Sequence, residues 1–75
     1  MRKILISSDP SYENLVAEIY YNEKFVALIN QEQGENKLEI EFPDTRVDEN
    51  FVERKMPLSF LTQAIEEAVR KLQNK

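Results

Sequence analysis

The chain has 75 residues and a mass of 8.9 kDa, which suffices for one small domain and excludes most large enzyme architectures. Its 14 acidic and 10 basic side chains give a net charge of −4, which makes direct nucleic-acid binding a poor expectation. Without Cys or His it lacks thiol nucleophiles, zinc-finger ligands and imidazole acid–base groups. We therefore expect a single non-enzymatic domain over residues 1–75, with no cofactor and no catalytic residue.

The beginning of the chain carries only a short apolar run, residues 4–6, before the turn at Asp9 and Pro10. A signal peptide needs an apolar core of about 7 residues or more, and a membrane-spanning helix needs about 20. We therefore expect a cytoplasmic protein with no membrane partner. The absence of cysteine fits a reducing compartment.

Three segments have the composition of β-strands. Residues 3–7 are aliphatic and β-branched and end before Asp9 and Pro10. Residues 14–21 and 24–31 flank two residues that fit a tight hairpin loop. The order of these segments predicts an antiparallel arrangement that begins with a short strand and continues as a hairpin.

The two-residue loop, Asn22 and Glu23, predicts the register of this hairpin. It pairs Ile19 with Val26 and therefore makes both faces largely apolar. One face is predicted to hold Leu15, Ala17, Ile19, Val26 and Leu28, and the other Val16, Tyr20, Phe25, Ala27 and Ile29 with the charge of Glu18. Such a hairpin is either covered on both sides or has one face available for a partner.

Residues 37–42 alternate between apolar and charged side chains without exception. This period of two predicts a half-buried strand whose Glu39 and Glu41 face water. The only glycine, Gly34, lies shortly before it, where a reversal of the chain with positive φ is easiest. The sequence therefore predicts a turn at Gly34 followed by a further strand.

The remainder of the chain predicts a loop, a possible fifth strand and a helix. Residues 44–50 are polar, and residues 51–56 could form a strand with charges on both faces. Ser59 is a good N-cap residue, with Leu58 before it as a staple contact. The apolar stripe that follows has helical spacing and consists of Phe60, Leu61, Ala64, Ile65, Ala68, Val69 and Leu72.

These elements together predict an α+β fold. The expected architecture is an antiparallel meander sheet of four or five strands with one C-terminal amphipathic helix packed on one face. Two pairs in the favourable order, Glu66 with Arg70 and Glu67 with Lys71, support a helix of about 14–16 residues. Strand order and the sheet face that the helix covers stay open at this point.

Carboxylates are the only side chains with catalytic chemistry that occur in large number. Glu39 and Glu41 share a strand face at roughly 6–7 Å, a spacing that glycosidase carboxylates also show. Alternating charges on an exposed strand are usually solvated, and so small a domain has little room for a saccharide cleft. Asp44, Asp48 and Glu49 lack the glycine and the ligand spacing of a calcium loop. We therefore expect neither catalysis nor a metal site.

The distribution of charge is more informative than the net value. Residues 9–53 hold twelve acidic and three basic side chains, a balance of −9. If the sheet presents this acidity on one face, it attracts a basic protein partner. Tyr20, beside Glu18, has the character of an interface anchor. The candidate partner-binding residues are Glu18, Tyr20, Glu39, Glu41, Asp44, Asp48 and Glu49.

Three segments carry a resemblance to a known class of proteins. They are residues 12–20 (YENLVAEIY), 25–34 (FVALINQEQG) and 38–43 (LEIEFP), followed by the terminal amphipathic helix. In layout the chain resembles small bacterial immunity proteins of polymorphic or contact-dependent toxin systems. The resemblance implies a cytoplasmic, non-enzymatic inhibitor that binds a toxin domain, often a basic nuclease, through an acidic face. It assigns no role to any single residue, because such families bind through surfaces that differ between members.

Two alternatives stay open at the level of sequence. One is a phage or mobile-element inhibitor, such as an anti-CRISPR protein that mimics the charge of a nucleic acid. The other is a structural module that self-associates as a homodimer, because strands with two apolar faces can pair edge to edge or face to face. The oligomeric state separates this last alternative from the inhibitors.

Overall fold

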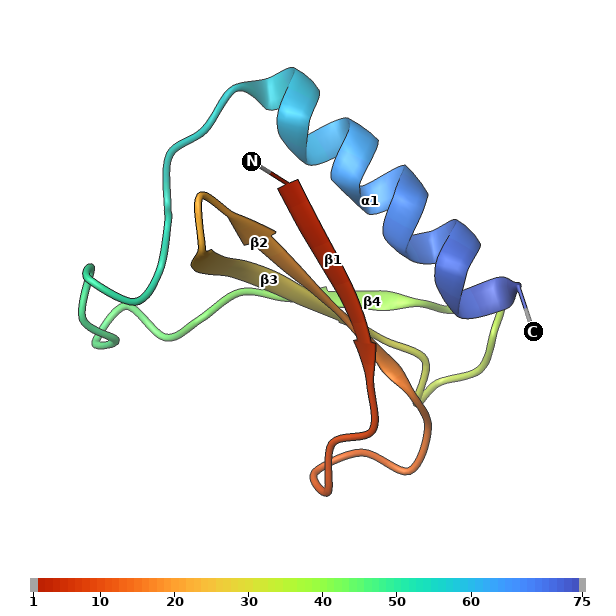
Figure 1. Ribbon diagram of the computed structural model, residues 1–75. Coiled ribbons are helices and arrows are strands. Elements are labelled where there is room, and N and C mark those ends of the chain that lie inside the picture. The colour runs from red at the N-terminus through yellow and green to blue at the C-terminus, as the bar shows by residue number, and fades with distance from the viewer. Residues whose placement is uncertain (1, 75) are drawn as a thin grey trace.

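Residues 2–74 are described by a computed structural model, in which one antiparallel sheet is covered on one side by a single helix (Figure 1). The elements in chain order are β1 (Arg2–Ser7), β2 (Val16–Tyr21), β3 (Lys24–Asn30), β4 (Glu39–Glu41) and α1 (Leu58–Gln73). The strands lie in the order β1-β2-β3-β4, so the predicted meander and the α+β class are confirmed.

The possible fifth strand, left open by the sequence, is absent from the described part of the chain. Within residues 51–56 the structure has one isolated parallel bridge, between Val52 and Phe25 of β3. The backbone N–H of Phe25 donates to the carbonyl of Phe51 at 3.0 Å, and the N–H of Glu53 donates to the carbonyl of Phe25 at 2.9 Å. This segment therefore touches the edge of β3 at a single residue, and the sheet has four strands within residues 2–74.

The hairpin between β2 and β3 has the predicted two-residue loop but a different register. Asn22 and Glu23 have φ values of 50° and 69°, as a tight turn of the type I′ class requires. Beyond the turn, however, Ile19 pairs with Ala27, because β3 contains one extra residue in a bulge at Val26. The predicted pairing of Ile19 with Val26 is therefore wrong.

The bulge redistributes the side chains of β3 between the two faces. Ala27 and Ile29 lie on the side of the helix, where Val26 also packs, whereas Leu28 lies on the other side. This reverses the predicted faces for three residues of the strand. The buried core between sheet and helix consists of Ala17, Ile19, Val26, Ala27 and Ile29 from the sheet and Ala64, Ala68 and Leu72 from α1.

The helix has the predicted apolar stripe but begins earlier than predicted. Its N-cap is Pro57, whose carbonyl accepts the N–H of Phe60 at 3.1 Å, and no side chain caps this end. The predicted capping role of Ser59 is therefore wrong, since Ser59 already lies in the first turn. The other end is stabilised by basic residues in the last turn and by an ion pair of 3.1 Å between Glu67 and Lys71.

The helix lies over one half of the sheet. It packs on β1 and β2, so the helix side of β4 is only partly covered (Figure 1). Ile40 and Phe42 consequently keep 37% and 61% of their surface exposed. The prediction that residues 37–42 form a half-buried strand is correct in position, but β4 is only three residues long and its apolar side chains reach solvent. Gly34, with φ of 113°, confirms the predicted turn before it.

Candidate protein-binding surface

The helix-free face of the sheet brings together four of the predicted partner-binding residues. Side chains alternate across a strand, so the residues that do not face α1 share the opposite face. This face holds Lys3, Leu5 and Ser7 of β1, Val16, Glu18 and Tyr20 of β2, Leu28 and Asn30 of β3, and Glu39 and Glu41 of β4. It is the only broad face of the described sheet that no helix covers.

One row across this face alternates between apolar and acidic side chains. The register pairs Leu5 with Glu18, Glu18 with Leu28, and Leu28 with Glu41. We call these four residues the acidic row. Two carboxylates thus flank one leucine, and their strands are about 10 Å apart at a spacing of about 4.8 Å per strand.

Neutral hydrogen-bond donors fix the position of the Glu18 carboxylate. The hydroxyl of Ser7 donates to its Oε2 at 2.8 Å, and the hydroxyl of Tyr20 donates to its Oε1 at 2.7 Å. The ring of Tyr20 is held in turn by Phe25, edge to face, with centroids 5.7 Å apart. Both oxygens of Glu18 are therefore oriented by neutral groups.

The same contacts raise the pKa of Tyr20 from 10.0 to about 12, first through partial burial, then through the bond to Glu18 and its charge. We expect a phenol titration, followed by absorbance at alkaline pH, to show one tyrosine near 12. Because the folded-state pKa is raised, this contribution to stability is complete below about 10 and is lost as the pH rises towards 12.

Glu18→Gln is expected to lower the pKa of Tyr20 part of the way towards 10.0, because the amide still accepts the hydroxyl but has no charge. Tyr20→Phe should remove the late-titrating group and thereby identify it. A tyrosine that still titrates near 12 in Tyr20→Phe would contradict the assignment.

Glu41 is held in a corresponding way on β4. Both of its carboxylate oxygens lie 2.9 Å from the hydroxyl of Tyr12, and its Oε2 accepts the side-chain amide of Asn30. Tyr12 comes from the segment between β1 and β2, and its hydroxyl reaches Glu41 on β4. The bond to Glu41 is also the main reason that the pKa of Tyr12 is raised.

Glu32 secures the segment that carries Tyr12. Its carboxylate accepts the backbone N–H groups of Glu13 and Asn14 at 2.8 and 3.0 Å. These bonds lower the pKa of Glu32, which shows that it serves as a structural acceptor for this segment. No local pattern singles out Glu32, Tyr12, Asn30 or Ser7, because their hydrogen-bond partners are remote in the chain.

The remaining predicted residues, Asp44, Asp48 and Glu49, lie in the loop that continues beyond β4 (Figure 1). Asp44 accepts the backbone N–H of Arg46 at 2.8 Å and forms an ion pair of 3.1 Å with its guanidinium, which lowers the pKa of Asp44. Asp48 accepts the backbone N–H of Asn50 at 2.8 Å. The two aspartates therefore stabilise their own turns, and only Glu49 has a side chain without such a role.

Within residues 2–74 no group of three acidic side chains is arranged to hold a metal ion. In the same range no helix has the length and apolarity needed to cross a membrane. Comparison of the chain with protein-family models, with curated proteins and with solved structures finds no significant match. The arrangement of this surface itself must therefore indicate what the chain does.

Proposed function

We propose that this chain is a non-enzymatic inhibitor that binds a basic protein through the helix-free face of its sheet. One observation carries the proposal: Glu18 and Glu41 have no cationic partner at ion-pair distance among the side chains that the structure describes, and neutral groups hold both. Oriented carboxylates with an unpaired charge are suited to charge-assisted bonds with Arg or Lys of a partner. Leu28 lies buried between them, and Leu5 at the other end of the acidic row, 38% exposed, supplies the apolar contact.

The more specific form of the proposal is an immunity protein that neutralises a nuclease-type toxin. This form follows from the resemblance of residues 12–20, 25–34 and 38–43 to such proteins. In this mechanism the acidic row pairs with the cations that the toxin uses on its own substrate. The inhibitor then blocks access without performing any chemistry, which agrees with a chain that has no Cys and no His.

Capture from lysate of the source cell with three baits tests the proposal. The baits are the natural chain, Glu41→Gln, and the matched control Glu66→Gln, which removes the same charge from the exposed side of α1. We expect one basic protein to be retained at about 50 mM salt by the natural chain and by Glu66→Gln, and to be released at about 500 mM. Glu41→Gln should retain clearly less, because the amide preserves the bond from Tyr12 but not the charge.

Equal retention by Glu41→Gln and Glu66→Gln would contradict a role for the acidic row. If the capture experiment recovers no protein other than the bait, the alternative function of a self-associating module is favoured. One observation favours that alternative: β1 is the end strand of the described sheet, so its outer edge is unpaired, and its side chains Leu5 and Ile6 are exposed. A mass of twice 8.9 kDa in light scattering would then support a homodimer over an inhibitor.

A further inference from the structure

A second surface, on the opposite face of the sheet, is apolar and incompletely filled. Two hollows lie along α1: one of about 210 Å³ against β4, and one of about 350 Å³ against Phe42, Pro43 and residues 53–56. One wall is a stripe of α1 at helical spacing, namely Leu58, Leu61, Ile65 and Val69. The other wall is the alternating set Leu38, Ile40 and Phe42. We call this surface the α1–β4 groove.

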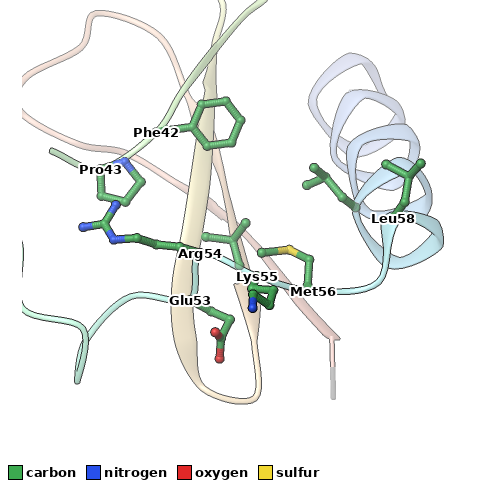
Figure 2. Close-up of a pocket in the computed structure, with 9 residues that line it drawn as sticks. Phe42, Pro43, Glu53, Arg54, Lys55, Met56 and Leu58 are labelled. Atoms are coloured by element: carbon green, nitrogen blue, oxygen red, sulfur yellow. The ribbon is translucent and has the colours of Figure 1, made fainter. Parts of the chain in front are cut away.

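Figure 2 shows the side chains around the larger of the two hollows. Phe42 lies at one side of the larger hollow and Leu58 at the other, with Met56 between them. Val26, which the bulge turns towards the helix side, lines the bottom. Phe42 and Leu58 are 61% and 75% exposed, so both walls offer apolar surface to solvent.

The dimensions of the two layers indicate what shape this groove accepts. Four strands at about 4.8 Å spacing make a sheet about 19 Å wide, and packed helices lie 8–10 Å apart. This width leaves space for a second helix beside α1, which lies mainly over β1 and β2 and packs on side chains of β3 at its margin. The stripe from Leu58 to Val69 is about 17 Å long at 1.5 Å per residue, which matches a helix of about 11–12 residues.

The charges at the open end indicate the chemistry of the occupant. Arg54 and Lys55 line this end together with Glu53, so the cations are in excess. The guanidinium of Arg54 donates to the carbonyls of Asp44 and Val47 at 2.9 and 3.2 Å, and these bonds orient it. Lys55 is exposed. An apolar groove with this end attracts an acidic side chain.

We propose that the α1–β4 groove binds an amphipathic helix of a partner protein, with its apolar stripe in the groove and an acidic residue beside Lys55. The bound helix completes the second layer over β3 and β4. This site does not depend on the acidic row, which lies on the other face of the sheet. The single covered half of the sheet and the cationic end of the groove both support this occupant.

Synthetic peptides test the groove directly. The probes are three helical peptides of about 14 residues: one with a leucine stripe and glutamates, one with the same stripe and lysines, and one with the glutamate sequence scrambled. Binding is followed by fluorescence anisotropy, and the site is mapped by amide chemical shifts of the full chain. We expect saturable binding of the first peptide, weaker binding of the second, and shifts centred on Ile40, Leu61 and Ile65.

Variants of exposed residues keep this test free of folding effects. Phe42→Ala is expected to weaken binding about tenfold or more, as for an anchor residue of an interface. Phe51→Ala is the matched control, because Phe51 is 69% exposed and lies outside the groove, and it should change the affinity less than about twofold. Lys55→Glu should reverse the preference between the acidic and the basic peptide.

Three results would overturn the proposal. The first is the absence of saturable binding of the glutamate peptide up to about 1 mM, or equal binding of the scrambled peptide. The second is a set of chemical-shift changes on the acidic row. The third is a stable dimer in light scattering whose interface covers Phe42, since a second copy would then occupy the groove. Loss of binding to the basic partner in Glu41→Gln has no bearing on any of these readouts.

Discussion

Replacing Ile19 with alanine is expected to lower the free energy of unfolding by about 3 kcal/mol. Ile19 has no exposed surface and belongs to the core between the sheet and α1. Its shortening removes three carbon atoms and leaves a cavity beneath a helix that cannot collapse far. A domain of this size has a total stability of about 4–11 kcal/mol, so the loss is a large part of it.

Urea denaturation followed by circular dichroism measures this effect. Leu58→Ala serves as the control, because Leu58 is 75% exposed and loses almost no buried contact. Its expected cost is below about 0.5 kcal/mol. If Ile19→Ala were no more destabilising than Leu58→Ala, the helix would not be packed on β2 as described.

Local sequence patterns predicted the elements of the fold because each pattern is complete within its own segment. The apolar stripe from Phe60 to Leu72 repeats at helical spacing and forms α1. Asn22 readily adopts positive φ, and the expected two-residue turn forms with positive φ at Glu23 as well. Both features depend on neighbours within a few residues, so they can be predicted without knowledge of the tertiary structure.

The bulge at Val26 and the exposure of Phe42 were not predictable in the same way. Residues 24–30 are continuously apolar in their centre, so either register of the hairpin buries apolar side chains. The choice depends on how β3 packs against α1. Similarly, the alternation around Ile40 shows which side of the strand is apolar, but the position of α1 over β1 and β2 decides whether that side is covered.

In the candidate site too, some residues could be predicted from the sequence and others could not. Its charged members, Glu18 and Glu41, stood out through the acidity of residues 9–53. The groups that orient them did not, because Tyr12 is 29 residues from Glu41 and Ser7 is 11 from Glu18. Such hydrogen-bonded pairs form only when the meander brings separate segments together, so no short sequence motif predicts them.

Asn30→Asp is expected to destabilise the fold by about 3 kcal/mol at neutral pH. Asn30 is only 3% exposed, and its amide donates to the carboxylate of Glu41 while its Oδ1 accepts the N–H of Glu32 at 3.1 Å. The substitution removes the donor and places two carboxylates in contact. Like-charge repulsion and burial raise the pKa of the introduced carboxyl above its usual value of about 4.

The sign of the pH dependence follows from that raised pKa. The protonated form of the introduced carboxyl can donate to Glu41, so the variant should regain stability as the pH falls and lose it as the pH rises. Denaturation at about pH 5 and about pH 8 measures the difference. Asn36→Asp, at an exposed position, is the control and should show neither the loss nor the pH dependence.

A second substitution separates the repulsion from simple loss of packing. In the Asn30→Asp background, Glu41→Gln supplies an amide donor to the introduced carboxylate and thereby exchanges the two partners of the natural bond. We expect the pair of substitutions to recover most of the lost stability, with a coupling of about 1–3 kcal/mol in the double-mutant cycle. Additive losses would show that Asn30 matters for its shape alone and that the Glu41 carboxylate is not held in the orientation that the acidic row requires.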